Sequence, residues 1–141
     1  MNTWKNLFAT KVTLEEVTEE LDRFIGEFNH LVETINFNDY SSIVLLADWV
    51  NHGLPYNEAS YTVNTQGLVV LKGVIKNGRY NNGVIIGSIP SAHAPKHTQV
   101  FTVVCNNSTA RIDIEPTGAI KIYNASSNLL LSLDGIVYVR T

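Results

Sequence analysis

The 141-residue sequence has one cysteine and no long apolar run, which excludes two classes of protein. Its longest uninterrupted apolar run, 43–47, is far shorter than the roughly 20 residues that a membrane span needs. A disulfide scaffold needs cysteine pairs, whereas a lone cysteine in an apolar run such as Cys105 is typical of a small core residue. The N-terminus has no apolar signal segment, so we expect synthesis in a cytoplasm and no membrane insertion.

Charged residues are also few, at 16% of the chain, and they are unevenly spread. Residues 14–36 hold seven acids and one base, whereas the chain from residue 40 onward holds seven bases and five acids. The basic excess of the second part is too small and too scattered for a nucleic-acid surface, so we expect no nucleic-acid partner. Contact with an anionic glycan is compatible with this balance.

A helical pattern begins at Thr13, which together with Glu16 matches a capping box. The apolar residues that follow are spaced alternately by three and four, a period of 3.5 that is typical of a left-handed coiled coil. These residues form the predicted oligomerisation seam: Leu14, Val17, Leu21, Phe24, Phe28, Leu31 and Ile35.

The seam predicts self-association, because the chain has no second heptad segment that could cover it. Ile25 and Val32 widen the apolar stripe, and a wide stripe is buried better among three helices than between two. We therefore expect a parallel homotrimer. The alternative is an amphipathic helix that folds back on the rest of its own chain.

After residue 36 the apolar period changes from 3.5 to 2. Residues 109–115 and 119–123 alternate, and the intervening residues 116–118 predict a hairpin. Turn-forming residues recur every 8–12 positions, and strands are expected at about 60–64, 68–76, 84–89, 98–105, 109–115, 119–124, 128–132 and 136–140. Such short strands predict an antiparallel sandwich or jelly roll.

The sequence thus predicts a mainly β protein with an N-terminal α-helix: a trimeric coiled-coil stalk followed by a small antiparallel β-sandwich or jelly-roll knob. Its expected parts are an N-terminal arm (1–12), a coiled-coil helix (13–36), a linker (37–48) and a β-sandwich head domain (49–141). The arm contains Trp4 and is apolar enough to anchor the chain to a larger assembly.

The head resembles the C-terminal domains of bacteriophage tail fibres over about residues 49 to 140. The segments that carry this resemblance are Trp49-Val-Asn-His-Gly53 with Tyr56, Gly67-Leu-Val-Val-Leu-Lys-Gly73, Val74-Ile-Lys-Asn-Gly78, Ile86-Gly-Ser-Ile-Pro90 and Leu131-Ser-Leu-Asp-Gly-Ile136. Residues 91–95 depart from the usual Gly-Tyr-Arg-Pro turn, and Leu129 or Leu130 replaces a tryptophan.

The resemblance implies a homotrimeric receptor-binding protein at the tip of a phage tail, made in the host bacterial cytoplasm. Such a protein recognises a bacterial cell-surface saccharide or teichoic acid during host adsorption. Its N-terminal arm would bind other phage tail or baseplate proteins. The alternative is a structural trimeric connector or cap of a baseplate or tail fibre that binds no receptor.

Two loops have the composition of a saccharide site, in which an aromatic ring stacks on the sugar and polar groups bind its hydroxyls. They span 49–57 and 77–83, and the candidate saccharide-binding residues in them are His52, Tyr56, Asn57, Arg79, Tyr80, Asn81 and Asn82. We hypothesise a site between neighbouring subunits. Trp49 is expected to pack the base of the knob, and a plain turn explains Tyr80 equally well.

Other chemistry is weakly indicated. Pro95 prevents the helix that would place His93 and His97 on one face, so loop histidines are expected, with a metal site on a threefold axis as the alternative. Asp113 and Glu115 could form a glycosidase pair, but the wet face of a half-buried strand explains them better. We expect no enzyme activity, no cofactor and no metal.

Overall fold

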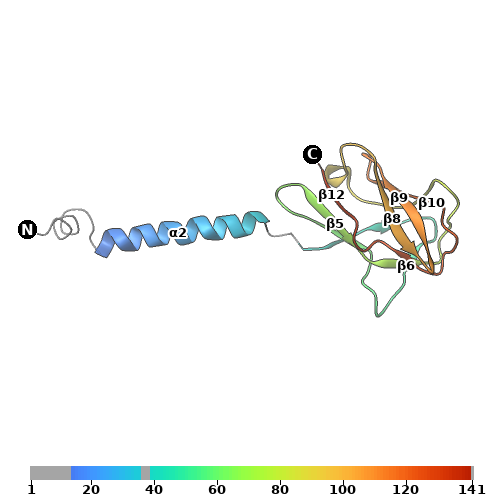
Figure 1. Cartoon of the computed structure of the whole chain (residues 1–141), viewed down its shortest axis with the longest axis horizontal. Coiled ribbons are helices and arrows are strands. Elements are labelled where there is room, and N and C mark those ends of the chain that lie inside the picture. Colours follow the sequence, from blue (N-terminus) through green and yellow to red (C-terminus); the bar gives the residue numbers. More distant parts are fainter. Residues whose placement is uncertain (1–13, 36–38, 141) are drawn as a thin grey trace, which may run out of the picture. The chain divides into compact units, whose positions relative to one another are not determined.

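The computed structural model describes residues 14–35 and 39–140 of the chain. The chain divides between residues 36 and 37 into two compact units (Figure 1). The first unit contains helix α2, and the second contains all the strands. The expected N-terminal arm, 1–12, lies outside the described residues.

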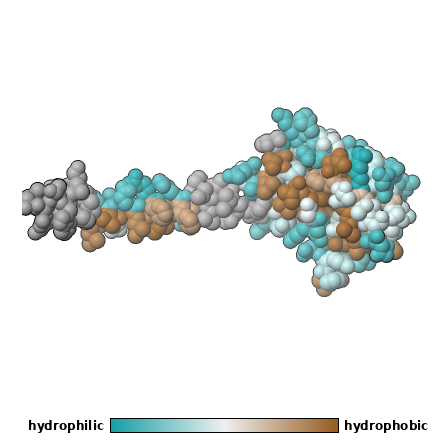
Figure 2. Space-filling view, viewed as in Figure 1, coloured by the Kyte–Doolittle hydropathy of each residue, from teal (hydrophilic) through white to brown (hydrophobic). Residues whose placement is uncertain are grey.

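Helix α2, Leu14–Ile35, confirms the predicted helix. One face of it is hydrophobic and the opposite face hydrophilic (Figure 2). Five seam side chains are exposed by about half or more: Leu14 83%, Val17 49%, Leu21 56%, Phe24 65% and Phe28 56%. The side chains of the other two seam residues, Leu31 and Ile35, lie outside the described part. In the described ranges, no helix is long and apolar enough to cross a membrane.

The second unit, the β unit, is built from short antiparallel strands. Their bounds are β1 Ser41–Ser42, β2 Val44–Leu45, β3 Val50–Asn51, β4 Ser60–Val63, β5 Leu68–Lys72, β6 Val74–Lys76, β7 Val84–Ser88, β8 Gln99–Cys105, β9 Ser108–Ile114, β10 Ala119–Tyr123, β11 Leu131–Ser132 and β12 Val137–Val139. One sheet has the order β1-β4-β5-β12, and the other has the order β2-β7-β10-β9-β8-β11-β6-β3. The predicted antiparallel sandwich is confirmed, and each of the eight expected strand segments contains at least one strand.

The core consists of aliphatic side chains from both sheets. Those that are at most 1% exposed include Val69, Leu71, Ile75, Ile112, Ile120, Leu131 and Ile136. Burying one such side chain contributes roughly 1.5–3 kcal/mol. Cys105 belongs to this core, as expected, and its Sγ lies 3.3 Å from the carbonyl oxygen of Ser127.

The hairpin predicted at residues 116–118 joins β9 to β10, which pair from Ile120 opposite Ile114 to Tyr123 opposite Arg111. Gly118 has a φ of +91°, and a Cβ there would overlap the carbonyl oxygen of Ile89. Only glycine fits this position, because it meets both constraints without strain.

The range expected to be a linker, 37–48, contains β1 and β2. β2 pairs with β7. Ile43, which lies between β1 and β2 in the sequence, is buried in the core with 5% exposure. The β unit therefore includes residues that the sequence assigned to a linker. Strands of two residues are too short to show the alternation by which a strand is recognised in a sequence.

Trp49 packs in the core with 3% exposure, which confirms its expected structural role. Its Nε1 donates a hydrogen bond to the carbonyl oxygen of Arg79 at 2.9 Å. Gly78 lies against the indole so closely that a Cβ there would overlap the ring. The turn after β6 is thus fixed to the core through this ring.

Replacing Gly78 with alanine should lower the free energy of unfolding by about 2–3 kcal/mol, because overpacking displaces the Trp49 ring. The control is Gly135→Ala, where nothing lies within 4 Å of a new Cβ but φ is +83°. The backbone strain alone should cost about 1 kcal/mol there. Chemical denaturation followed by tryptophan fluorescence measures both. A Gly78→Ala variant as stable as the control would contradict the packing described.

Candidate ligand-binding surfaces

The first candidate loop, 49–57, contains β3, and the segment 52–57 that follows this strand protrudes from the β unit (Figure 1). Both of its ends are held by Val74 of β6. The backbone N–H of His52 donates to the Val74 carbonyl at 2.9 Å, and the Val74 N–H donates to the Asn57 carbonyl at 3.1 Å. The tip between these anchors is open to solvent, with Leu54 95% exposed.

Within this loop, the rings of His52 and Tyr56 meet edge to face, with centroids 4.9 Å apart and planes at 85°. The Tyr56 N–H donates to the Gly53 carbonyl at 3.0 Å, which closes a turn under the ring. The Tyr56 side chain is 39% exposed. His52 therefore braces a tyrosine ring that remains available to a ligand.

The second candidate loop, 77–83, leaves the end of β6. The Arg79 N–H donates to the Ala47 carbonyl at 2.9 Å, and the Arg79 guanidinium lies 3.6 Å from the Asp48 carboxylate. Both of these charged side chains are largely exposed. Tyr80 is 38% exposed and Asn81 is exposed as well.

Asn82 has a structural role in the same loop. Its Oδ1 accepts a hydrogen bond of 2.8 Å from the backbone N–H of Asn124, the residue that follows β10. The N–H of Asn77 likewise donates to the Asn128 carbonyl at 2.7 Å. These hydrogen bonds hold the loop in place, and the side chains of Arg79, Tyr80 and Asn81 extend from it into solvent.

The structure does not bring the exposed parts of the two loops, 52–57 and 77–83, together within one chain. β3 and β6 pair antiparallel, with Val50 opposite Lys76 and Asn51 opposite Ile75. The loop 52–57 follows β3 and the loop 77–83 follows β6, so they leave opposite ends of this strand pair. The contact between the two candidate loops is made by Trp49 at the start of the first loop, whose Nε1 donates to the Arg79 carbonyl at 2.9 Å. In the described part of the chain, no hydrogen bond, ion pair or ring contact joins residues 52–57 to residues 77–83.

A cavity of about 560 Å³ lies elsewhere on the β unit, and the sequence did not reveal it. Its walls are residues 65–67 and 94–96 with Ser91, Pro116 and Arg140. These residues come from three turns and the last described position. No spacing signal links residues so far apart in the sequence, so only the fold brings them together.

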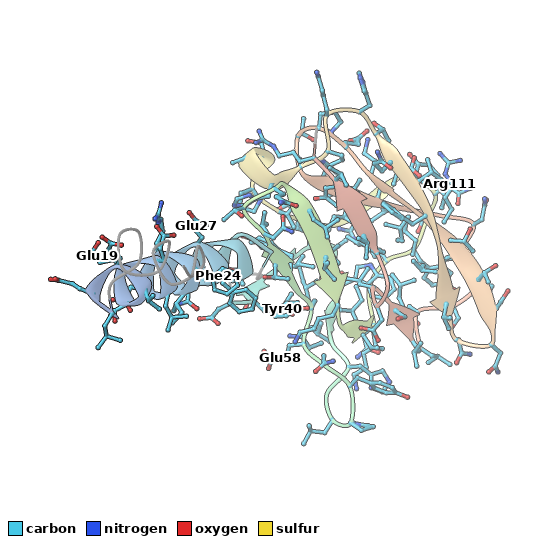
Figure 3. The ribbon with its side chains drawn as sticks, turned by 60° about the vertical axis from the view of Figure 1, so that its left-hand side comes forward. Glu19, Phe24, Glu27, Tyr40, Glu58 and Arg111 are labelled. Carbon is cyan, nitrogen blue, oxygen red and sulfur yellow. The ribbon has the colours of Figure 1, made fainter. Side chains whose placement is uncertain are left out.

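A second, smaller cavity of about 280 Å³ includes Asn57, the candidate residue at the end of the first loop. Tyr40 and Glu58 also line it (Figure 3). The Nζ of Lys72 lies 3.7 Å from the centroid of the Tyr40 ring, an arrangement typical of a cation–π contact. Asn57 thus lies in a polar hollow apart from the exposed ring of Tyr56.

The expectation that Asp113 lies on a wet strand face is wrong, because its side chain is only 8% exposed. The Arg111 side chain points outward from β9 in Figure 3, and its guanidinium donates hydrogen bonds to both carboxylate oxygens of Asp113 at 2.8 and 2.7 Å. This hydrogen bonding raises the pKa of Arg111. Glu115 pairs with Lys121 at 3.1 Å. Each carboxylate of the supposed glycosidase pair is thus matched with its own cation.

His93 ends a short 3₁₀ helix, Ser91–His93, and is held by Tyr138. The Tyr138 hydroxyl donates to the His93 carbonyl at 2.7 Å, and burial raises the pKa of this tyrosine. His97 is exposed. Within residues 14–35 and 39–140, no three His, Cys, Asp or Glu side chains are grouped so as to hold a metal ion.

The architecture is that of a β sandwich whose chain also carries an N-terminal helix. A solved structure of this class, the crystal structure of the receptor binding protein (gp15) of Listeria phage PSA, is similar to this chain with a TM-score of 0.73. The match covers 100% of this chain and 88% of that one at 18% identity, so it shows a shared fold. The sequence matches no protein-family model and no curated protein.

Stability should fall at high pH through Tyr138. Burial raises the pKa of Tyr138 in the folded protein, so the folded protein holds this proton more tightly than the unfolded chain does. The free energy of unfolding therefore falls as the pH rises above about 10, the pKa of tyrosine in the unfolded chain. The loss should approach about 1.4 kcal/mol per pH unit.

Tyr138→Phe removes this group and should reduce stability by about 0.5–1.5 kcal/mol at neutral pH. The difference in the free energy of unfolding between the wild-type protein and Tyr138→Phe should then shrink above about pH 10. Denaturant titrations from pH 7 to 11 measure it. Arg111 and Lys121, whose pKa values are also raised, are present in both proteins and cancel in the comparison. If the free energy of unfolding of the two proteins changed with pH in parallel, the buried Tyr138 hydroxyl would not be the cause of the loss of stability at high pH.

Proposed function

We propose that this chain is a phage tail receptor-binding protein that recognises a bacterial cell-surface saccharide or teichoic acid during host adsorption. The observation that carries the proposal is the likeness of fold, over the whole chain, to a phage receptor binding protein. The sequence resemblance to tail-fibre domains supports it through different evidence, since it depends on residue motifs. The protein would then lie at the tail tip of the virion.

The two loops supply the chemistry that a saccharide needs. Tyr56 and Tyr80 are each more than a third exposed, and tyrosine rings stack on the apolar faces of sugars. Arg79 and Asn81 lie next to Tyr80 in sequence and can bind hydroxyl groups, whereas Asn57 would do so from the smaller cavity. Because the loops leave opposite ends of the β3–β6 pair, we propose that each completes a site with a neighbouring subunit.

We further propose that three copies associate through α2. The seam is wide: Ile25, which is 47% exposed, adds to Phe24 and Phe28 beside it. Each seam side chain gains roughly 1.5–3 kcal/mol when it is buried. A trimer also presents three sites to one polymer, and the resulting avidity compensates for weak binding at each site. The N-terminal arm would attach this trimer to other tail or baseplate proteins.

The loop assignment predicts that Tyr56→Ala and Tyr80→Ala each weaken binding to host cells while leaving the fold intact. Loss of a stacking ring should reduce affinity by about 2- to 10-fold per site. The control is Val104→Ala, which shortens an exposed side chain (53%) on β8, outside both loops and both cavities. Fluorescently labelled protein and whole cells give the affinity, and circular dichroism checks the fold. Wild-type binding by both loop variants would contradict the loop assignment, whereas absence of cell binding by the unaltered chain would favour the structural connector.

The trimer assignment predicts that Leu21→Asp removes most of the helical signal, because an amphipathic helix such as α2 gains most of its stability from packing of its apolar face. The control is Glu19→Lys, which changes a charge on the face away from the seam. Far-ultraviolet circular dichroism at 222 nm, with thermal melts of the β signal, separates the two units. Equal helicity in both variants would contradict burial of the seam.

A further inference from the structure

The 560 Å³ cavity lies at the end of the β unit opposite the loop 77–83. Strand β7 begins beside that loop at Val84 and ends at Ser88, and Ser91 of the cavity follows soon after. Ala119 pairs with Ser88, so the hairpin that carries Pro116 is at the same end. The cavity is therefore separate from the loop 77–83, and none of its lining residues belongs to the loop 52–57.

The charges in this cavity are of one sign. Lys96 and Arg140 line it, and no acidic residue does. Elsewhere on the β unit the basic side chains mostly have partners, since Arg79, Arg111 and Lys121 each pair with a carboxylate. Lys96 and Arg140 form no ion pair with any other residue in 14–35 or 39–140. Two unpaired cations beside a hollow in a chain of net charge −3 attract an anion.

The walls of the cavity are held in place by hydrogen bonds. Asn64, which is 8% exposed, accepts bonds from the N–H groups of Gln66 and Leu68 at 2.9 Å each through its Oδ1. The Arg140 N–H donates to the Gly67 carbonyl at 2.9 Å. The backbone of residues 64–68 and of Arg140 is thus fixed before a ligand arrives, which lowers the entropic cost of binding.

We propose that this cavity binds an oxyanion, either a phosphate or a carboxylate group, carried by a hydroxylated polymer. Lys96 and Arg140 would pair with the anion, as both side chains do with phosphate and carboxylate oxygens. Gln66 and Ser91 would bind neighbouring hydroxyls. A volume of about 560 Å³ is in the range of small-ligand sites. This inference rests on the proposed function and adds the charge class of the receptor.

The test titrates the full chain with three probes by isothermal calorimetry: a short glycerol phosphate oligomer, an oligogalacturonate and a neutral malto-oligosaccharide. One or both anionic probes should bind, more weakly as salt is raised, and the neutral probe should bind more weakly than they do. Lys96→Gln and Arg140→Gln should each reduce affinity by about tenfold, the loss of one charge-assisted contact. The two anionic arms distinguish phosphate from carboxylate recognition.

The matched control is Lys76→Gln, which removes an equal charge from β6 outside the cavity and should change affinity by less than about twofold. Failure of both anionic probes to bind, or equal losses in Lys96→Gln and Lys76→Gln, would overturn the inference. Host-cell binding is measured separately on the same variants. Cell binding that persists without anion binding refutes this site alone, whereas anion binding without cell binding refutes the proposed function.

Discussion

The apolar seam of α2 imposes the main physical constraint on this protein. In a single chain Leu14, Leu21, Phe24 and Phe28 are each more than half exposed, and Val17 nearly so. Helices of this length gain most of their stability from burying such a face. The 3–4 spacing of these residues suits other copies of the same helix better than a globular surface. The proposed trimer follows from this requirement, and so does the presence of several β units in one particle.

The β unit, in contrast, has a core of its own, and its surface is divided between two kinds of chemistry. Exposed tyrosines lie on the loops 52–57 and 77–83, at opposite ends of the β3–β6 pair. The cationic cavity with Lys96 and Arg140 lies at the other end of β7 from the second loop. A polymer with both sugar rings and anionic groups could contact both kinds of surface. Threefold repetition of weak contacts would then give useful affinity.

Local rules account for what the sequence predicted correctly. The helix follows from regular spacing, and the 116–118 hairpin follows from a Pro-Thr-Gly turn between alternating strands. The burial of Asp113 was missed, because the Arg111 pairing that covers it depends on side-chain geometry rather than alternation. β1 and β2 are too short to have a pattern. The cavity joins residues from 65 to 140, a combination that only the tertiary fold determines.

The solution mass of the unaltered chain, measured by light scattering coupled to size exclusion, tests the central claim most directly. Burial of the α2 seam among three parallel helices predicts a mass of three times 15.6 kDa at all concentrations used. A mass of 15.6 kDa would mean that the seam is covered within its own chain or remains exposed. That result would contradict the trimer and the avidity that depends on it.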